Sequence, residues 1–207
     1  MGDLLIFLIC VPATYLIGGI PFGLIYGKVF KGIDIREMGS KNIGAANAFR
    51  ALGPIGGVLT ILLDASKGGF PVYFAKEYYH LIPIAVVFIA LAAIAGHNWS
   101  IFLRFKGGKG ISTLFGVTLV ISPETAAIGF LIWLLLTVIT KYSALGSIVG
   151  SFTLPLCAYF LLNLQFTYTV FFVLIFIFVI IKHKSNIKRL IEGTELKITD
   201  KVQKKIH

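Results

Sequence analysis

The chain has 207 residues, of which 57% are hydrophobic and only 14% charged, and its mean hydropathy is +0.90. So little polar surface excludes an ordinary soluble domain and predicts an integral membrane protein. The net charge of +10 does not indicate nucleic-acid binding, because the basic residues lie between apolar stretches, where they mark the cytoplasmic face of a membrane protein.

Apolar stretches follow one another along the whole chain and predict an all-α, polytopic membrane helix bundle. Several stretches are shorter than the roughly 20 residues of a normal span, which is compatible with tilted, extended or re-entrant segments. Five to seven spans fit, and about seven transmembrane helices in one domain, residues 1–207, are expected. The seven stretches are residues 4–26, 54–75, 81–95, 111–121, 125–140, 143–164 and 167–181.

The distribution of lysine and arginine predicts the orientation. Seven spans with the N-terminus outside place 17 of the 19 basic residues on one side, all except Lys67 and Lys76. That side is expected to be the cytoplasm. Residues 182–207 are then a cytoplasmic tail, predicted to be a helix along the membrane surface because Ile187, Leu190 and Ile191 have helical spacing.

The first polar cluster follows the first apolar stretch, at residues 39–50. It offers Ser40, Asn42, Asn47 and Arg50 as hydrogen-bond donors for phosphate oxygens, and a guanidinium can bind phosphate bidentately. Asn47 and Arg50 share a face if the segment is helical. The alternative is local: Ser40 caps a helix and Asn42 makes an Asx-turn.

The second apolar stretch contains two charged residues, Asp64 and Lys67. Isolated charges are costly at this depth, so an ionisable pair is a functional hypothesis by default. A structural pair that neutralises itself and holds helices together explains the pattern equally well.

The second polar cluster is rich in glycine. Lys106, Gly107, Gly108, Lys109 and Gly110 have the residue types of a phosphate cradle, since glycine lets N–H groups approach a ligand closely and lysine adds a mobile charge. The run lacks the Walker pattern. A polar turn between membrane helices would explain it too.

Residues on either side extend this second cluster. A helix beginning after Gly110 would add its free N–H groups, and the hydroxyl of Ser112, to a phosphate site. Upstream, His97 is interpreted as a histidine hydrogen-bonded at a helix end or, less favourably, as a proton carrier.

The third cluster, residues 183–195, begins the tail. His183 and Asn186 lie three residues apart and can point toward one bound group. Lys184 and Lys188 fit a basic helix that touches anionic lipid headgroups.

Taken together in this order, the three clusters resemble the bacterial acyl-phosphate:glycerol-3-phosphate acyltransferase family. Gly39, Ser40, Asn42, Gly44, Asn47 and Arg50 carry the first motif, residues 105–110 with Gly96 and His97 the second, and His183, Asn186, Arg189, Gly193 and Glu195 the third. The resemblance implies a multi-pass enzyme of the bacterial cell membrane, active on its cytoplasmic side in phospholipid synthesis.

The resemblance also implies a reaction: transfer of a fatty acyl group from acyl phosphate to the 1-hydroxyl of glycerol 3-phosphate, giving lysophosphatidic acid and phosphate. The donor is already activated, so no acyl-enzyme is expected. Few carboxylates cluster and no Cys/His ligand spacing appears, so neither a metal nor a cofactor is expected. The implied catalytic residues are Ser40, Arg50, Lys109, His183 and Asn186. The implied substrate-binding residues are Asn42, Asn47, Lys106, Gly107, Gly108, Gly110, Ser112, His97 and Glu195.

A different class of function fits some of these features. Basic residues near helix ends could form the pathway of a transporter for phosphate-bearing anions. Because all three clusters fall on one expected face and no paired repeat is visible, the sequence favours the one-sided enzyme.

Overall fold

The computed structural model describes residues 2–202, and within this range all regular structure is helical, as predicted. The first expected apolar stretch is divided between two helices by a break at residues 20–21, and each of the others falls largely within one helix; short 3-10 or π turns extend or connect some of the helices. The α-helices are α1 (Asp3–Gly19), α2 (Phe22–Lys31), α3 (Ala45–Tyr73), α4 (Pro83–Asn98), α5 (Ile111–Ile121), α6 (Pro123–Thr140), α7 (Ser143–Leu156), α8 (Phe166–Lys182) and α9 (Lys184–Ile191).

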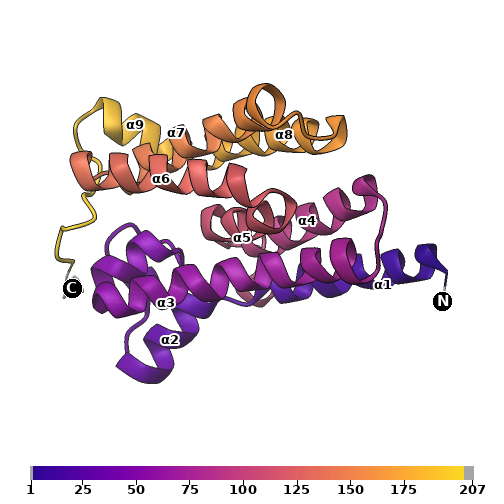
Figure 1. Cartoon of the computed structure of the whole chain (residues 1–207). Helices are drawn as coiled ribbons and strands as arrows, with labels where there is room; N and C mark the ends of the chain where they lie inside the picture. The colour runs from indigo at the N-terminus through magenta and orange to yellow at the C-terminus, as the bar shows by residue number, and fades with distance from the viewer. Residues whose placement is uncertain (1, 203–207) are drawn as a thin grey trace.

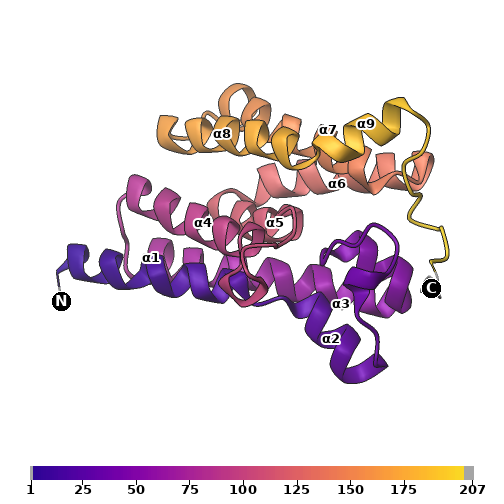
Figure 2. The ribbon, with the colours of Figure 1, turned by 180° about the vertical axis from the view of Figure 1, so that it is seen from behind.

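The number of possible spans lies within the expected range of five to seven when each bent helix pair is taken as one span. Four helices of the described chain are long and apolar enough to cross a membrane, and six if the bent pairs α1–α2 and α8–α9 each count as one. The remaining stretch forms α5, whose 11 residues are too few to cross alone. Even so, Figures 1 and 2 place the start of α1 and helix α9 at opposite ends of the bundle, as an odd number of passes would.

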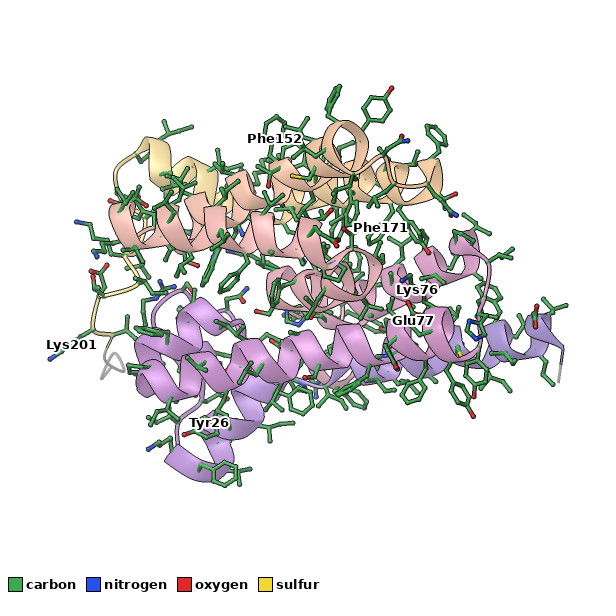
Figure 3. The ribbon with its side chains drawn as sticks, in the orientation of Figure 1. Tyr26, Lys76, Glu77, Phe152, Phe171 and Lys201 are labelled. Atoms are coloured by element: carbon green, nitrogen blue, oxygen red, sulfur yellow. The ribbon has the colours of Figure 1, made fainter. Side chains whose placement is uncertain are left out.

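The helices form two layers (Figure 1). Helices α1, α2 and α3 make one layer, α6, α7 and α8 make the other, and α4 and α5 lie between them. Figure 3 shows Lys76 and Glu77 near the end where α1 begins, far from Lys201 at the end where α9 lies. Lys76 is therefore separated from the basic tail, as the charge distribution requires.

Helix α3 is bent near its start. Gly53 has φ 81° and ψ −178°, and Pro54 follows it. A residue before proline is driven out of the α region, and glycine adopts a positive φ without a Cβ penalty. The bend separates the first two turns of α3, which carry Asn47 and Arg50, from the apolar remainder.

Close backbone contact fixes α5 against α3. A Cβ added to Gly116 would overlap the carbonyl of Ala65, and one added to Gly68 would lie 2.5 Å from the carbonyl oxygen of Thr113. Small residues at helix crossings let membrane helices approach closely, where packing rather than hydrophobicity drives association. The start of α5 is thereby held at a fixed depth beside the middle of α3.

The tail is helical over only part of the expected range. Helix α9 ends at Ile191, and Gly193 adopts φ +68°, a left-handed conformation that commonly terminates helices. Residues 194–202 continue without regular helix, and residues 203–207 of the predicted tail helix lie outside the described chain.

The α3–α5 crossing generates a prediction. Gly116→Val should prevent stable folding, because the side chain would overlap the backbone of α3, which cannot move aside as a flexible side chain can. The matched control is Leu119→Phe, which adds volume to the same helix at a side chain that is 48% exposed. Thermal unfolding in detergent should show a strongly lowered unfolding temperature for Gly116→Val and little change for Leu119→Phe. Equal unfolding temperatures in the two variants would contradict the packing argument.

Candidate active site

A cavity of about 650 Å³ lies between the two layers, a size typical of small-molecule sites. Polar residues from all three sequence clusters meet at one part of it, and apolar side chains of α3, α5, α6 and α7 line the rest. The cavity brings together most of the expected site residues, namely Ser40, Asn42, Asn47, Arg50, His97, Lys109, Gly110, Ser112, His183, Asn186 and Glu195.

Asn47 builds the loop of the first cluster. Its Nδ2 donates to the carbonyl oxygens of Ile35 at 2.8 Å and Asn42 at 2.9 Å, and its Oδ1 accepts from the backbone N–H of Ser40 at 3.0 Å. The side chain is 1% exposed. We expected Asn47 to bind substrate, but its amide is already satisfied by the loop, so we infer that it shapes the loop and presents Ser40.

Asn42 makes the Asx-turn that was predicted as an alternative to phosphate binding, but this turn uses only part of its side chain. Its Oδ1 accepts from the N–H of Gly44 at 2.8 Å, which is an Asx-turn immediately before α3. Because the bond uses only the oxygen, its Nδ2 group stays available as a donor toward the cavity that Asn42 lines.

Arg50 lines the cavity and is held loosely. Its guanidinium donates to the Oγ of Ser40 at 3.4 Å and to the carbonyl oxygens of Leu196 and Lys197 at 3.5 and 3.4 Å. These bonds are longer than those of well-paired arginines, which measure about 2.7–2.9 Å. The buried Nε has no partner within residues 2–202. Arg50 therefore keeps donor capacity for an anion.

The glycine loop does not surround the cavity as a cradle. Lys106 is exposed, and neither it nor Gly107 or Gly108 lines the cavity. A Cβ on Gly107 would overlap the carbonyl of His97, and a Cβ on Gly108 would overlap the imidazole of His97. Close packing against the end of α4 accounts for both glycines without a ligand, and the role of these three residues in substrate binding stays a prediction.

Lys109 emerges from this packed loop into the cavity. Its Nζ donates to the Oδ1 of Asn186, whose Nδ2 donates in turn to Glu195 at 2.6 Å. The other carboxylate oxygen of Glu195 accepts from the Nε of Arg189 at 2.7 Å. Glu195 is 9% exposed and both its oxygens are engaged, so it orients Asn186 rather than offering itself to a ligand.

The lysine is electrostatically unusual. The pKa of Lys109 is lowered to about 8, chiefly because burial disfavours its charged form. Glu195 opposes this shift, whereas the cations Arg189, Arg50 and Lys182 add to it. A bound anion would stabilise the charged form of Lys109, which burial and the neighbouring cations disfavour.

His183 has a defined tautomer. Its Nδ1 lies 2.9 Å from the carbonyl oxygen of Val179, and because a carbonyl can only accept, Nδ1 must carry the hydrogen. In the neutral ring the Nε2 is then an acceptor. The ring is 3% exposed and lines the cavity, so it can receive a hydrogen bond from a hydroxyl group there.

Helix α5 begins at the cavity wall. Gly110 caps it with φ 79° and no side-chain cap, which leaves its first N–H groups without intrahelical partners. Asn98 and Thr113, 1% and 0% exposed, carry buried polar atoms with no partner in the described chain, and the Asn98 amide lies beside Gly110. Neither Asn98 nor Thr113 lines the cavity, but Gly110 and Ser112 do, so the free N–H groups of the helix N-terminus suit an anion there.

The apolar part of the cavity opens toward the membrane. Val58 and Leu62 of α3 are 50% and 56% exposed, and Leu134 and Val138 of α6 are 40% and 55% exposed, although all four line the cavity. Figure 1 shows α3 and α6 on the same side of the molecule, one in each layer. An alkyl chain can therefore enter sideways between them.

The segment after α9 crosses the polar end of the cavity. We call residues 194–202 the strap. The N–H of Ile198 donates to the carbonyl oxygen of Lys141 at 2.8 Å, and Leu196, Ile198 and Thr199 line the cavity. The strap thus links α9 to the α6–α7 turn and passes over Arg50.

Comparison with known proteins identifies the family. The sequence model described as "Glycerol-3-phosphate acyltransferase" matches residues 8–193, which is most of the chain. The chain belongs to the glycerol-3-phosphate acyltransferase family. A relative of that name from Desulforamulus reducens is 48% identical over 91% of this chain and 93% of its own length. Another, from Fusobacterium nucleatum, is 43% identical over 89% of this chain and 94% of its own length.

Solved structures agree. The chain resembles PlsY, described as an integral membrane glycerol 3-phosphate acyltransferase, at 36% identity over 92% of this chain and 94% of that one. The TM-score is 0.87 for its glycerol 3-phosphate form and 0.85 for its lysophosphatidic acid form. The chain is therefore an integral membrane acyltransferase with the PlsY fold.

Sequence reasoning missed the parts of the acyltransferase site that lie in α6, in α7 and in the strap beyond Glu195. Phe130 and Trp133 of α6 pack ring against ring, with centroids 5.5 Å apart, and line the cavity. Ser147 and Ser151 of α7 line it as well. The available signal was the small residues of α7 at four-residue spacing, which indicates close helix packing rather than a cavity.

The strap contact can be tested in the acyltransferase. Ile198→Pro removes the N–H that donates to Lys141, at a cost of about 1 kcal/mol for a typical net hydrogen bond. Hydrogen–deuterium exchange over residues 194–202 should quicken about fivefold while the unfolding temperature of the bundle stays unchanged. Ile198→Ala, which keeps the donor, is the control. Unchanged exchange in the proline variant would show that the strap is held by other contacts.

Proposed function

We propose that this acyltransferase uses acyl phosphate as its donor and esterifies the 1-hydroxyl of glycerol 3-phosphate. The observation that carries the proposal is one cavity with two chemistries: cationic and amide donors at one end, and an apolar wall open to lipid along the rest. Acyl phosphate and glycerol 3-phosphate both carry phosphate, and only the first carries a chain that belongs in the membrane.

The phosphate groups bind at the polar end. Lys109 supplies a buried charge, Arg50 a guanidinium with spare donors, and Ser40 a hydroxyl beside it. The free N–H groups at the start of α5 add fixed dipoles. Donors aimed at charge that develops on the acyl carbonyl and on the departing phosphate stabilise the transition state, and they are stronger in a site from which water is excluded.

The acceptor alcohol is oriented by His183 and Asn186. Its 1-hydroxyl oxygen attacks the carbonyl carbon, the bond from that carbon to the phosphate oxygen breaks, and inorganic phosphate leaves. Two groups can take the hydroxyl proton: the Nε2 of His183, left free by the bond to Val179, and an oxygen of the departing phosphate. No acyl-enzyme is required, because the mixed anhydride is already activated.

The acyl chain lies along the apolar wall and extends between α3 and α6. The exposed side chains of Val58 and Val138 line a route by which donor and product exchange with the bilayer. This arrangement explains why the polar residues gather near one end of the bundle. We place that end at the cytoplasmic face of the bacterial cell membrane, in keeping with the orientation predicted from the sequence, in which seven spans put 17 of the 19 basic residues on that side.

The function is tested with purified protein in detergent. Palmitoyl phosphate should release phosphate only when glycerol 3-phosphate is present, with lysophosphatidic acid formed in equal amount, and palmitoyl-CoA should not replace it. Transfer from palmitoyl-CoA alone would overturn the donor assignment. A folded protein with no transfer, but with flux of glycerol 3-phosphate into proteoliposomes, would support the transporter.

Lys109→Ala should lower kcat by about 10²- to 10³-fold, the usual cost of removing a preorganised donor from a charge-stabilising site. The matched control is Lys106→Ala, three residues away, which removes an exposed lysine outside the cavity and should retain most activity. Size-exclusion chromatography and thermal unfolding would confirm that both proteins are folded. Near-normal turnover in the Lys109 variant would remove this residue from the site.

The pH profile should report Lys109. Because its pKa is lowered to about 8 and the cation binds phosphate, kcat/KM should fall as the pH rises through about 8. A phosphate monoester titrates near pH ~6, so the substrate cannot supply this limb. Lys109→Arg keeps its charge up to about pH 12 and should move the limb upward even if overall activity drops. An unmoved limb would assign it to another group.

A further inference from the structure

The proposed mechanism leaves the charged pair of α3 without a role. Asp64 and Lys67 are 2% and 4% exposed, and the Nζ of Lys67 lies 2.7 Å from the Oδ1 of Asp64. Burial carries a large desolvation penalty for each ion, and a well-packed apolar pair is often as stable or more so. Mutual neutralisation therefore does not by itself account for the pair.

Lys67 points away from the cavity. Its Nζ also donates to the carbonyl oxygen of Ile20 at 2.7 Å and lies 5.7 Å from the centre of the Phe22 ring. This carbonyl belongs to the break between α1 and α2, where helical hydrogen bonding is interrupted. The lysine is thus anchored to another helix, and it holds the Asp64 carboxylate at one place on α3.

Asp64, in contrast, lines the cavity and faces His97 of α4. The Nδ1 of His97 lies 3.8 Å from the Oδ2 of Asp64 and has no hydrogen-bond partner among residues 2–202. The gap is too long for a direct bond and suits a bridging water or a small shift of the ring. Both side chains are 2–3% exposed, so neither has a competing solvent partner.

The other side of His97 fixes the glycine loop. The carbonyl oxygen of His97 accepts from the N–H of Gly108 at 3.0 Å. Its Nε2 occupies the space that a Cβ on Gly108 would need. The next residue is Lys109, which enters the cavity. A chain of contacts therefore runs from the charged pair through His97 to the lysine of the phosphate site.

We propose that Asp64 and His97 are positioning residues for the phosphate end of the active site: the carboxylate fixes the imidazole, and the imidazole and its backbone fix Gly108 and so aim Lys109. This inference rests on the proposed function. It differs from the expectation that His97 binds substrate, and it gives the Asp64–Lys67 pair a task that an apolar pair could not perform, because only an acceptor at position 64 can hold the ring.

Two neutral double variants separate positioning from charge balance. Asp64→Leu with Lys67→Met removes both charges and the acceptor. Asp64→Asn with Lys67→Met removes both charges but keeps a carbonyl oxygen that can accept from His97. Neither leaves a buried unpaired charge, so both should fold. The leucine pair should lower kcat/KM for glycerol 3-phosphate about 10- to 100-fold, as misplacement by about 1 Å can, and the asparagine pair should recover most of it.

Two further measurements decide the remaining cases. Hydrogen–deuterium exchange over residues 105–113 should quicken in the leucine pair and not in the asparagine pair, a readout that needs no turnover. If the wild-type protein is inactive, the proposed function is wrong, but the exchange measurement over residues 105–113 still tests the positioning role. Active double variants that match each other in exchange and in kcat/KM would overturn the proposal.

His97→Gln keeps the charged pair and tests the same chain of contacts if the leucine pair does not fold. It should lower kcat/KM to a similar degree and quicken exchange over residues 105–113. Combined with the leucine pair, its effect should be less than additive, since both remove one contact. Full activity and an unchanged loop in His97→Gln would overturn the positioning role.

Discussion

The close approach of the glycine loop to the end of α4 is the contact on which the site depends. Gly108 donates its N–H to His97 at 3.0 Å, and no side chain fits between the loop and the helix. This contact ends α4 and starts α5 within the bundle, so that Lys109 and the first N–H groups of α5 reach the cavity. Because α5 is also pressed against the backbone of α3, neither end of the loop can shift independently, and the donors are preorganised.

The two layers give the cavity its two chemistries. Between α3 and α6, exposed apolar side chains that line the cavity face the bilayer. An alkyl chain that moves there from the lipid therefore loses few apolar contacts. Where the first loop, the glycine loop and α9 converge, the donors are drawn from segments far apart in the sequence: Arg50 contacts the strap at Leu196 and Lys197. An acyl phosphate can therefore keep its alkyl chain in the apolar part of the cavity while its phosphate reaches the donors of the polar part. Glycerol 3-phosphate can stay at the polar end.

Hydropathy and the polar clusters were sufficient to predict the membrane bundle, and most of the residues that they single out line the cavity. They did not predict the role of each residue. A glycine needed for backbone packing and one needed for ligand approach look alike in sequence, so the sequence alone could not show that Gly107 and Gly108 pack closely on His97. Asn47 has the donors of a phosphate ligand, yet three carbonyls and one N–H of its own loop use its amide. The short α5 has the bounds of the predicted stretch 111–121, whereas the path of the strap depends on tertiary contacts that local periodicity does not encode.

The hydrogen bond to Asn186 explains how the buried Lys109 remains able to attract an anion. A direct ion pair with Glu195 would neutralise it and leave little attraction for an incoming phosphate. Instead a neutral amide stands between them: Asn186 accepts from the lysine and donates to Glu195, while Arg189 takes the other carboxylate oxygen. The carboxylate fixes which way the amide faces, and its charge is largely balanced by the arginine. The lysine is therefore held in place by hydrogen bonding while its charge remains directed at the cavity, as a site for two anionic substrates requires.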